Sequence, residues 1–343
     1  MRKLLNTLYV TTPEAYLSLD GENVVILKED SALARFPLHN LESIVTFGYT
    51  GASPALMGKC AESGISLSFC TASGRFLADV KGETHGNVVL RRIQYRYADD
   101  EAQSLSISKN ILIGKLHNSR WVLKRATRDY PQRIDTKRVK NAAKIVANAV
   151  SGVQGAKSSG ELMGVEGEAA STYFSAFDEL ILTDKKNFFF RERNRRPPLD
   201  NVNALLSYVY TLLSYDTASA LSTVGLDPFV GFLHKDRPGR RSLALDMMEE
   251  LRAPLADRFV LTLINNRQIN HKSFEVMENG AVLLKADGRK DLLSAWQNRK
   301  RETIIHPFLK EKIEWGLVPY AQALLLARFL RGDLDGYPPF LWK

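Results

Sequence analysis

The sequence predicts an α+β protein in which a small N-terminal β domain with one short helix precedes a larger, mainly α-helical domain. Short β-rich runs fill the first 85 residues, whereas helical periodicity dominates after Gly86. The charge changes at the same place. Residues 1–85 carry 7 basic and 9 acidic side chains, a net charge of −2, and residues 86–343 carry 40 and 29, a net charge of +11. We therefore expect one domain at 1–85 and a second at 86–343.

Composition and motifs exclude several classes of protein. Hydrophobic residues make up 45% of the chain and charged residues 25%, as in ordinary globular proteins. The longest apolar stretch, 321–330, is interrupted by Arg328 and is too short to cross a bilayer, and the N-terminus shows no secretory signal. Cys60 and Cys70 can form neither a CxxC metal site nor a disulfide framework. We expect a soluble, cytoplasmic protein with no membrane partner.

The first 85 residues are predicted to form the β domain. The turn dipeptides Asp20-Gly21 and Ser73-Gly74 separate runs that are rich in β-branched and aromatic residues. Strands are expected at 7–11, 15–19, 24–27, 44–47, 65–69 and 76–80, and a short helix, closed by Gly64, at 52–62. No cluster of His, Cys and Asp lies in this region, so we expect it to serve packing or dimerisation rather than chemistry.

From Val88 onwards the pattern is mainly helical. Basic residues recur through a helical stretch at 88–129, and a second helical run covers 136–150. Ser158 and Glu161 have the spacing of a capping box, which predicts a helix from there to about Leu182. A basic, proline-containing loop follows. Further helices are predicted at 203–213, 242–252 and 255–267, and a hairpin around Asn279-Gly280 at 274–284.

Glu166 breaks the pattern of its own predicted helix. It lies within an apolar stripe at three- and four-residue spacing, one turn after Leu162 and one before Ala170. A carboxylate on such a stripe is unfavourable unless a cation, a metal ion or a hydrogen-bond donor compensates it. The alternative is an acid at the edge of the stripe that reaches solvent or pairs with an arginine.

A second cluster combines His234 with three acids, Asp246, Glu249 and Glu250. Acids three or four residues apart share a helix face and repel one another unless their charge is compensated. One explanation is a salt-bridge network with Arg237, Arg240, Arg241 and Arg252. The other is a divalent cation, because one imidazole and two or three carboxylates are a hard ligand set that suits Mn²⁺ or Mg²⁺ better than structural Zn²⁺.

A basic domain with such a ligand set suits phosphodiester chemistry. Cutting or joining a phosphodiester needs a cation that activates the attacking water or hydroxyl and stabilises charge on the phosphoryl oxygens. The candidate DNA contacts are arginines around His234 and in the basic loop, namely Arg237, Arg240, Arg241, Arg195 and Arg196. The sequence contains no P-loop, dinucleotide fingerprint or GxSxG elbow that would favour other chemistry.

Four segments between residues 162 and 269 are distinctive: LMGVEGEAASTYF, PPLDNVNALLSYVYTLL, GFLHKDRPGRRSLALDMMEELRAPLADR and LTLINNRQI. In order and spacing they resemble the CRISPR-associated protein 1 family, the integrases of CRISPR spacer acquisition. The resemblance extends over nearly the whole chain, and the sequence looks closest to the branch that accompanies type I-C systems. Its specific features are a Glu in an EG-x-A-A-x-x-Y/F context, a Phe-Leu-His, and a D-x-x-E before Leu-Arg.

The resemblance implies a site for Mn²⁺ or Mg²⁺ formed by Glu166, His234 and Glu249. Glu249 matches the acid that ends the family's D-x-x-[DE] motif. Asp246 matches the first acid of that motif, which sits next to the metal, and we count it with the catalytic residues as a group that tunes the site or accepts a proton. Whether Asp246 or Glu250 also ligates the metal stays open.

The resemblance also implies partners and a reaction. Family members form homodimers with their β domains at the interface, and a dimer of the small CRISPR-associated protein 2 bridges two such dimers. The complex holds a short DNA duplex, and each 3′-hydroxyl attacks a strand at the boundary of the CRISPR repeat. The reaction is a metal-assisted transesterification that needs no ATP. We therefore expect a CRISPR adaptation integrase with metal-dependent endonuclease chemistry.

Two other functions stay open from the residues alone. One is a metal-dependent nuclease that cuts branched or repair DNA without joining it. The other is a non-catalytic DNA-binding scaffold in which the acids and arginines merely pair. The scaffold is disfavoured, because an acid in an apolar stripe and a cluster of histidine and acids are costly to keep for packing alone.

Overall fold

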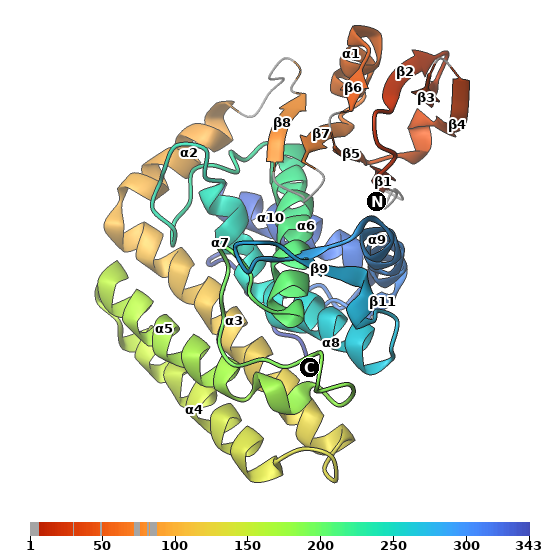
Figure 1. Cartoon of the computed structure of the whole chain (residues 1–343). Coiled ribbons are helices and arrows are strands. Elements are labelled where there is room, and N and C mark those ends of the chain that lie inside the picture. Colours follow the sequence, from red (N-terminus) through yellow and green to blue (C-terminus); the bar gives the residue numbers. More distant parts are fainter. Residues whose placement is uncertain (1–6, 30, 49, 72–75, 81, 83–87) are drawn as a thin grey trace. The chain divides into compact units, whose positions relative to one another are not determined.

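The computed structural model of the protein describes residues 7–29, 31–48, 50–71, 76–80, 82 and 88–343 (Figure 1). Strands dominate its N-terminal part and helices the remainder, which confirms the predicted α+β class. The chain divides into two compact units, residues 1–86 with 284–301, and residues 87–283 with 302–343. This division differs from the expected domains, 1–85 and 86–343, in the segment 284–301. Across the described residues, no helix combines the length and the apolar character needed to span a membrane.

Two four-stranded sheets make up most of the first unit. One runs in the order β1 (Thr7–Val10), β5 (Ser43–Phe47), β7 (Ser66–Cys70), β8 (Phe76–Val80), and β8 is antiparallel to β7 while the other pairs are parallel. The other runs in the order β4 (Ser31–Pro37), β3 (Asn23–Lys28), β2 (Tyr16–Asp20), β6 (Gly51–Ala52). Helix α1 (Pro54–Glu62) completes a core that contains the fully buried side chains of Leu17, Ile44, Leu56 and Leu67.

All six predicted strands and the predicted short helix are present, with ends shifted by no more than two residues. Strand β4 was missed because it lies at the edge of its sheet with mostly exposed side chains, so it has no alternating apolar face. The turn predicted at Ser73-Gly74 lies outside the described residues. Helix α9 (Ala286–Arg301) belongs to this unit because Gln297 donates to the Thr7 carbonyl and Lys300 lies 3.3 Å from the Thr7 hydroxyl.

The second unit is built from helices. Helices α3 (Glu101–Asp129), α4 (Thr136–Gly155) and α5 (Ser159–Ser175) lie side by side, and α2 (Val88–Asp99) precedes them (Figure 1). Helix α6 (Asn201–Val224) is apolar around most of its circumference and packs against its neighbours on several sides, α7 (Ser242–Leu251), α8 (Arg258–Asn265) and α10 (Val318–Leu330). It is longer than the predicted 203–213. It ends at Val224 and is followed by the C-cap residue Gly225, whose φ of 89° is left-handed.

Short elements connect these helices. The segment η2 (Phe177–Leu180), which follows α5, is a 3₁₀ turn. The segments η4 (His271–Ser273) and η5 (Trp315–Leu317) are also 3₁₀ turns. Strands β9 (Phe274–Val276) and β10 (Val282–Leu284) form the predicted hairpin around Asn279-Gly280, where Gly280 has a φ of 78°. A second antiparallel pair joins β11 (Thr303–Ile305) to β12 (Lys312–Glu314).

Helix ends and one wide turn place the helices that carry the charged residues. Asp100 divides the predicted stretch 88–129, because its carboxylate caps α3 by accepting from the Gln103 amide at 3.0 Å. The predicted cap at Ser158 is confirmed, since its hydroxyl accepts from the Glu161 amide at 3.2 Å, but α5 ends at Ser175 rather than near 182. The π-helical segment η3 (Arg252–Asp257) joins α7 to α8 around Pro254, which has no amide hydrogen to donate.

Candidate metal centre and the adjoining pocket

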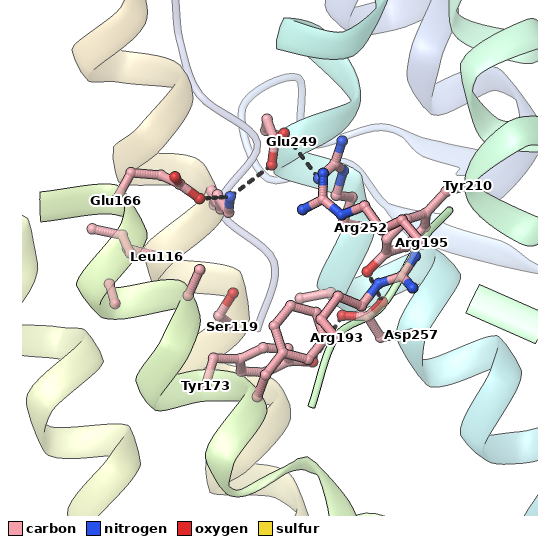
Figure 2. Close-up of a pocket in the computed structure, with 15 residues that line it drawn as sticks. Leu116, Ser119, Glu166, Tyr173, Arg193, Arg195, Tyr210, Glu249, Arg252 and Asp257 are labelled. Atoms are coloured by element: carbon pink, nitrogen blue, oxygen red, sulfur yellow. Dashed lines mark hydrogen bonds and ion pairs between the residues drawn. The ribbon is translucent and has the colours of Figure 1, made fainter. Parts of the chain in front are cut away.

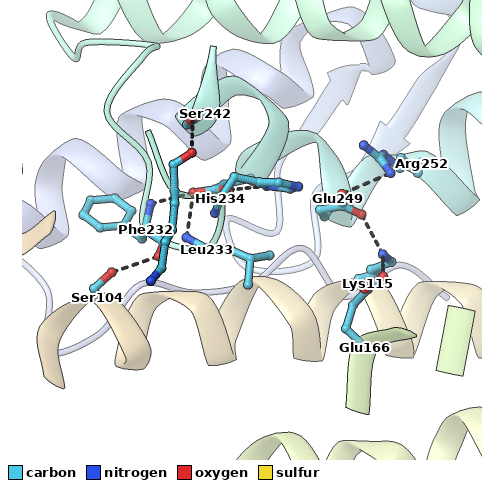
Figure 3. Close-up of polar contacts among 11 residues, drawn as sticks. Ser104, Lys115, Glu166, Phe232, Leu233, His234, Ser242, Glu249 and Arg252 are labelled. Carbon is cyan, nitrogen blue, oxygen red and sulfur yellow. Dashed lines mark hydrogen bonds and ion pairs between the residues drawn. The ribbon is translucent and has the colours of Figure 1, made fainter. Parts of the chain in front are cut away.

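Two acidic side chains from different helices face a single lysine. Glu166 lies in the middle of α5, Glu249 near the end of α7, and Lys115 on α3 between them (Figure 3). The Lys115 ammonium forms ion pairs with Glu166 Oε1 and with Glu249 Oε2, and the second distance is 2.8 Å. The exposed fractions of the side chains are 18% for Glu166 and 4% for Glu249. The fold therefore brings together two acids that are 83 residues apart.

The environment of Glu166 combines both interpretations of its sequence position. The side chain is half-buried and has a cationic partner, as a compensated acid on an apolar stripe requires. The partner is Lys115 of α3. The alternative interpretation, an acid at the edge of the stripe, predicted that Glu166 would reach solvent or pair with an arginine. Glu166 also lines a pocket, so this ion pair lies in a place that a ligand can reach.

Glu249 is the most buried of these charged groups and is held ionised. Arg252, three residues later, places its Nη1 3.1 Å from Glu249 Oε1, so each carboxylate oxygen faces a cation. Burial alone raises the pKa of Glu249, but the positive charges of Arg252 and Lys115 outweigh it and hold the pKa at about 2. Glu249 is therefore a carboxylate at any physiological pH.

Asp246 fixes the position and the tautomer of His234. Asp246 is fully buried, and its carboxylate accepts hydrogen bonds from the backbone amides of Phe232, Leu233 and His234 at 2.7–2.9 Å. Its Oδ1 also lies 2.6 Å from His234 Nδ1. Because a carboxylate accepts, Nδ1 carries the proton, and Nε2 is left with a lone pair when the ring is neutral. The imidazole extends towards Glu249 in Figure 3.

Glu250 faces another part of the unit. Its carboxylate accepts from the Gln322 side chain at 2.9 Å and from the Phe340 amide at 2.7 Å, both in the C-terminal region. Burial raises the pKa of Glu250 to about 8 in spite of these hydrogen bonds. Adjacent residues on α7 thus have opposite electrostatic environments, and only Glu249 faces the lysine and the pocket.

The residues fit a divalent cation in chemical type. Within the part of the chain that the structure describes, no three side chains of the His, Cys, Asp and Glu type already stand close enough to hold a metal ion. Instead, an ammonium group lies between two of the three expected ligands. Glu249 Oε2 is buried, and Lys115 contacts it as an ion-pair partner without the geometry of a hydrogen bond. Two carboxylates and one imidazole nitrogen are donors that Mn²⁺ and Mg²⁺ accept.

A pocket of about 530 Å³ of empty space, part of it open to solvent, adjoins these acids (Figure 2). Its polar lining comes from α3 and α5, from the end of α7 with η3, from Tyr210 of α6, and from the loop that contains Arg193 and Arg195. The cationic side chains in its wall are Lys115, Arg193, Arg195 and Arg252. Positive groups beside buried carboxylates are an arrangement that binds a metal and an anionic ligand together.

A buried carboxylate, Asp257, orders the far wall of the pocket. The hydroxyls of Tyr173 and Tyr210 donate to it at 2.9 and 2.6 Å. Burial raises the pKa of Asp257 to about 6 although these hydrogen bonds oppose the shift. Arg193 and Arg252 lie over the Tyr210 ring, with 5.4 and 5.0 Å between guanidinium carbon and ring centroid. The guanidinium groups are therefore held in fixed orientations.

The predicted DNA-contact arginines are distributed unevenly. Arg195 lines the pocket, and the exposed Arg196 follows it in the same loop. Arg237 is exposed, Arg240 is half-buried, and Arg241 lies 5.0 Å from the Tyr215 ring. These last three are not among the residues that line the pocket.

Sequence reasoning did not distinguish Lys115 and Arg193 from the basic residues around them. Lys115 lies one turn after Ile111 and one turn before Ser119, both of which are buried, so a basic residue interrupts a buried face of α3. Arg193 is distinguished by its hydrogen bonds to side chains of α6, to Asn203 Oδ1 at 2.7 Å and to Ser207 Oγ at 3.1 Å. Nothing in the loop sequence distinguishes it before the loop is folded against α6.

Comparisons with known proteins agree on one family. The family model described as CRISPR associated protein Cas1 matches residues 8–298. The chain is 51% identical over 343 residues to CRISPR-associated endonuclease Cas1 1 of Chlorobaculum tepidum, and both chains are covered completely. It is also 51% identical, over 347 residues and with complete coverage of both chains, to CRISPR-associated endonuclease Cas1 2 of Rhodospirillum rubrum.

Solved structures show the same fold at lower identity. A CAS1 protein from Thermotoga maritima superposes with a TM-score of 0.82 at 22% identity, over 96% of this chain and 99% of that one. A casposase bound to integration product superposes with a TM-score of 0.83 at 23% identity, over 98% of this chain and 93% of the casposase. The α+β architecture described above is therefore shared with both.

Proposed function

The chain belongs to the Cas1 family of CRISPR-associated proteins, and from that premise we propose that it is an endonuclease and integrase that inserts short DNA duplexes into a CRISPR array. Its curated relatives at 51% identity are named endonucleases, and the identity extends over the whole chain. The observation that carries the proposal is the pair of carboxylates on α5 and α7 beside an arginine-lined pocket.

The chemistry that we propose depends on a divalent cation, Mn²⁺ or Mg²⁺. Glu166, His234 and Glu249 would hold it. Such a cation, when bound, lowers the pKa of an attacking water or hydroxyl and neutralises charge on the phosphoryl oxygens. Asp246 keeps the proton of His234 on Nδ1, so that Nε2 stays available as a ligand. The charges of Arg252 and Lys115 keep Glu249 ionised, as a ligand must be.

The arginines of the pocket are proposed to bind the phosphate backbone. Arg193 is oriented by Asn203 and Ser207, and Arg252 by Glu249, so both guanidinium groups are fixed before DNA arrives. A planar guanidinium binds phosphate oxygens in pairs. Arg195 would extend this contact, and Arg196, Arg237, Arg240 and Arg241 would bind DNA outside the pocket.

The proposal includes partners that follow from the family. We propose a homodimer, with the β domains at the interface, and two such dimers bridged by a dimer of the CRISPR-associated protein Cas2. The DNA substrates would be a short duplex and the CRISPR repeat. A cytoplasmic location belongs to the same proposal, because Cys60 and Cys70 are free thiols, which persist in reducing compartments. Assignment to the type I-C branch likewise stays a prediction.

Strand transfer tests the proposal. A labelled short duplex and a supercoiled plasmid carrying the repeat are incubated with the protein, its Cas2 partner and Mn²⁺ or EDTA. We expect a joined product that requires Mn²⁺ and is lost in Glu166→Ala and His234→Ala, while duplex binding persists. Glu168→Ala and His271→Ala are matched controls, because both side chains are exposed and neither lines the pocket. Cutting without joining would instead identify a nuclease of branched or repair DNA.

One observation favours the scaffold alternative enough to test it. The acids of the centre do pair with cations, Glu166 with Lys115 and Glu249 with Lys115 and Arg252, as a purely structural cluster would. A scaffold predicts salt-sensitive DNA binding that is indifferent to EDTA and to Glu166→Ala, with neither cutting nor joining. That result in the same assay would overturn the enzymatic proposal.

A further inference from the structure

The ammonium group of Lys115 lies between the two acids that the proposed metal centre requires. It pairs with Glu166 Oε1 and with Glu249 Oε2, and its own side chain is only 14% exposed. Because the two carboxylates come from α5 and α7, nothing in the local sequence of either helix holds them together. A cation between them offsets their mutual repulsion in a poorly hydrated place. Lys115 thus lies between two of the three residues that would hold the cation.

The charges of this cluster balance without a metal. Glu166 and Glu249 contribute two negative charges, and Lys115 and Arg252 contribute two positive ones. A divalent cation added to this neutral cluster meets an ammonium group that already occupies both inward carboxylate oxygens. The metal and the ammonium therefore compete for the same two atoms, whereas Arg252 binds the other oxygen of Glu249 and can stay.

The pocket can receive the Lys115 ammonium when it leaves the two carboxylates. Lys115 lines the pocket together with Arg193 and Arg195, and the pocket is partly open to solvent. A lysine carries its charge at the end of a flexible side chain and can therefore move to a new partner. A guanidinium group that is held by several partners cannot move in this way. The displaced ammonium would remain among the cationic residues proposed to bind phosphate.

We propose that Lys115 is a placeholder cation that holds Glu166 and Glu249 together in the metal-free protein, is displaced by the divalent cation, and then binds a phosphate oxygen of the DNA. This inference rests on the proposed function, since it presupposes the metal centre. It makes Lys115 a positioning residue with two successive roles, first between the two carboxylates and then at a phosphate. No covalent bond is formed or broken in the exchange: the ion pairs of Lys115 are replaced by carboxylate–metal coordination and by an ammonium–phosphate contact.

Metal binding without DNA tests the first half of the proposal. Free Mn²⁺ is titrated by electron paramagnetic resonance against the full-length wild type, Lys115→Met and Lys109→Met. Lys109 is the matched control, because it lies on the same helix but its ammonium donates to the Gln154 carbonyl, away from the pocket. Removal of the competing ammonium should lower the apparent Kd of Lys115→Met by about tenfold, the change that corresponds to 1.4 kcal/mol. Lys109→Met should bind as the wild type does.

Thermal unfolding provides a second readout for the same variants. In EDTA, Lys115→Met should unfold at a lower temperature than the wild type, because the buried Glu249 and the half-buried Glu166 lose their shared cation. Mn²⁺ should raise its Tm by more than it raises that of the wild type. If Lys115→Met does not fold in EDTA, Lys115→Gln replaces it, because the glutamine side chain is only slightly shorter than lysine and still has a hydrogen-bond donor. We expect the same result for Lys115→Gln: a lower Tm than the wild type in EDTA and a larger increase of Tm with Mn²⁺.

The DNA half of the proposal is tested by coupling. A phosphorothioate duplex, which resists cleavage, should lower the apparent Kd for Mn²⁺ more in the wild type than in Lys115→Met, because only the wild type gains an ammonium–phosphate contact when the metal binds. Equal coupling in the two proteins would overturn this half.

The possible failures are distinguishable. Unchanged or weaker Mn²⁺ binding by Lys115→Met, alongside normal binding by the wild type, would overturn the placeholder role and leave the proposed function intact. Absence of Mn²⁺ binding by every variant and by the wild type would overturn the metal centre, and with it the proposed function.

Discussion

Asp246 shows, at the scale of single residues, how a buried carboxylate orders a site through another side chain. It accepts three backbone hydrogen bonds from residues 232–234 and one from the His234 ring. The Cβ of an alanine at Gly231 would lie 2.8 Å from Asp246 Oδ2 and 2.9 Å from the His234 carbonyl oxygen, so this turn tolerates no side chain there. The position of the imidazole thus depends on two residues that need not touch a substrate.

Asp246→Asn should therefore impair the site without removing a proposed ligand. The amide replaces one acceptor by a donor that faces backbone N–H groups and the His234 ring. We expect Mn²⁺ affinity to fall by about 10- to 100-fold, the usual effect of losing the partner of a metal-binding histidine. Titration of Mn²⁺ measures this, with the exposed Asp236→Asn as the control. Wild-type affinity in Asp246→Asn would contradict the positioning role.

Asp257 makes folding stability depend on pH. Burial raises its pKa from 3.8 to about 6 against the hydrogen bonds from Tyr173 and Tyr210 and the charges of Arg252 and Arg193. The folded protein therefore binds a proton that the unfolded chain has released between those values, so this group lowers stability as pH rises through that range. Asp257→Asn removes the effect. In denaturant unfolding, the free energy of unfolding of the variant should rise relative to that of the wild type from about pH 4 to about pH 7. A difference in free energy of unfolding that stays constant over this range would contradict the raised pKa of Asp257.

The sequence allowed some residues of the site to be chosen and not others. Glu166 stood out because a charge interrupts an apolar stripe, and the structure gives it a cation. Lys115 interrupts a stripe in the same way, but α3 carries many basic residues, and only the folded chain selects the one that faces two acids. By spacing alone, Glu250 looked equivalent to Glu249. Adjacent residues of a helix point about 100° apart, so Glu249 faces the pocket whereas Glu250 faces the buried hydrogen bonds around Gln322.

At the scale of elements, local signals set most boundaries and tertiary packing set the rest. The cap at Ser158 was predictable because the side chain that satisfies the first amides is a local feature. The extension of α6 to Val224 was not, since its second half contains small and polar residues that become helical against α7 and α10. The π-helical turn at η3 likewise reflects Pro254 within a helix that packing keeps continuous.

The C-terminal segment 337–343 is an element held by side chains rather than by regular structure. Tyr337, Phe340 and Trp342 are buried, and the Asn118 side chain of α3 donates to the carbonyls of Phe340 and Glu250 at 2.7 Å and accepts from the Trp342 amide at 2.8 Å. One asparagine thus connects the C-terminus to the helix that carries Glu249.

Asn118→Ala should loosen this connection. It leaves two carbonyls and one amide buried without this partner, at a cost of about 1–3 kcal/mol for each group left unsatisfied. We expect a lower free energy of unfolding in urea and earlier hydrogen exchange in both 337–343 and α7. The control is Asn141→Ala on α4, which is exposed and should change stability little. Exchange that is accelerated at the C-terminus but not in α7 would contradict the link.

At the scale of the whole molecule, charge and composition indicated the boundary near residue 86, but they did not indicate that the segment 284–301 belongs to the first unit. The shift from a net charge of −2 to one of +11 falls close to the boundary of the compact units at residue 86. Helix α9 belongs with the first unit although it ends in Arg299, Lys300 and Arg301 and resembles the basic half in composition. A segment that packs against a distant part of the chain leaves no compositional trace, so the sequence could not assign it.

Glu166, His234 and Glu249 are proposed to bind a divalent cation in the place that Lys115 holds in its absence. Anomalous diffraction at the manganese edge, from crystals of the protein grown with Mn²⁺, would locate that cation. We predict one strong peak at coordination distance, about 2–2.5 Å, from a carboxylate oxygen of each glutamate and from His234 Nε2, with Lys115 turned into the pocket. A peak elsewhere, or crystals in which Lys115 still bridges the two glutamates at saturating Mn²⁺, would rule out this metal site and the displacement of Lys115.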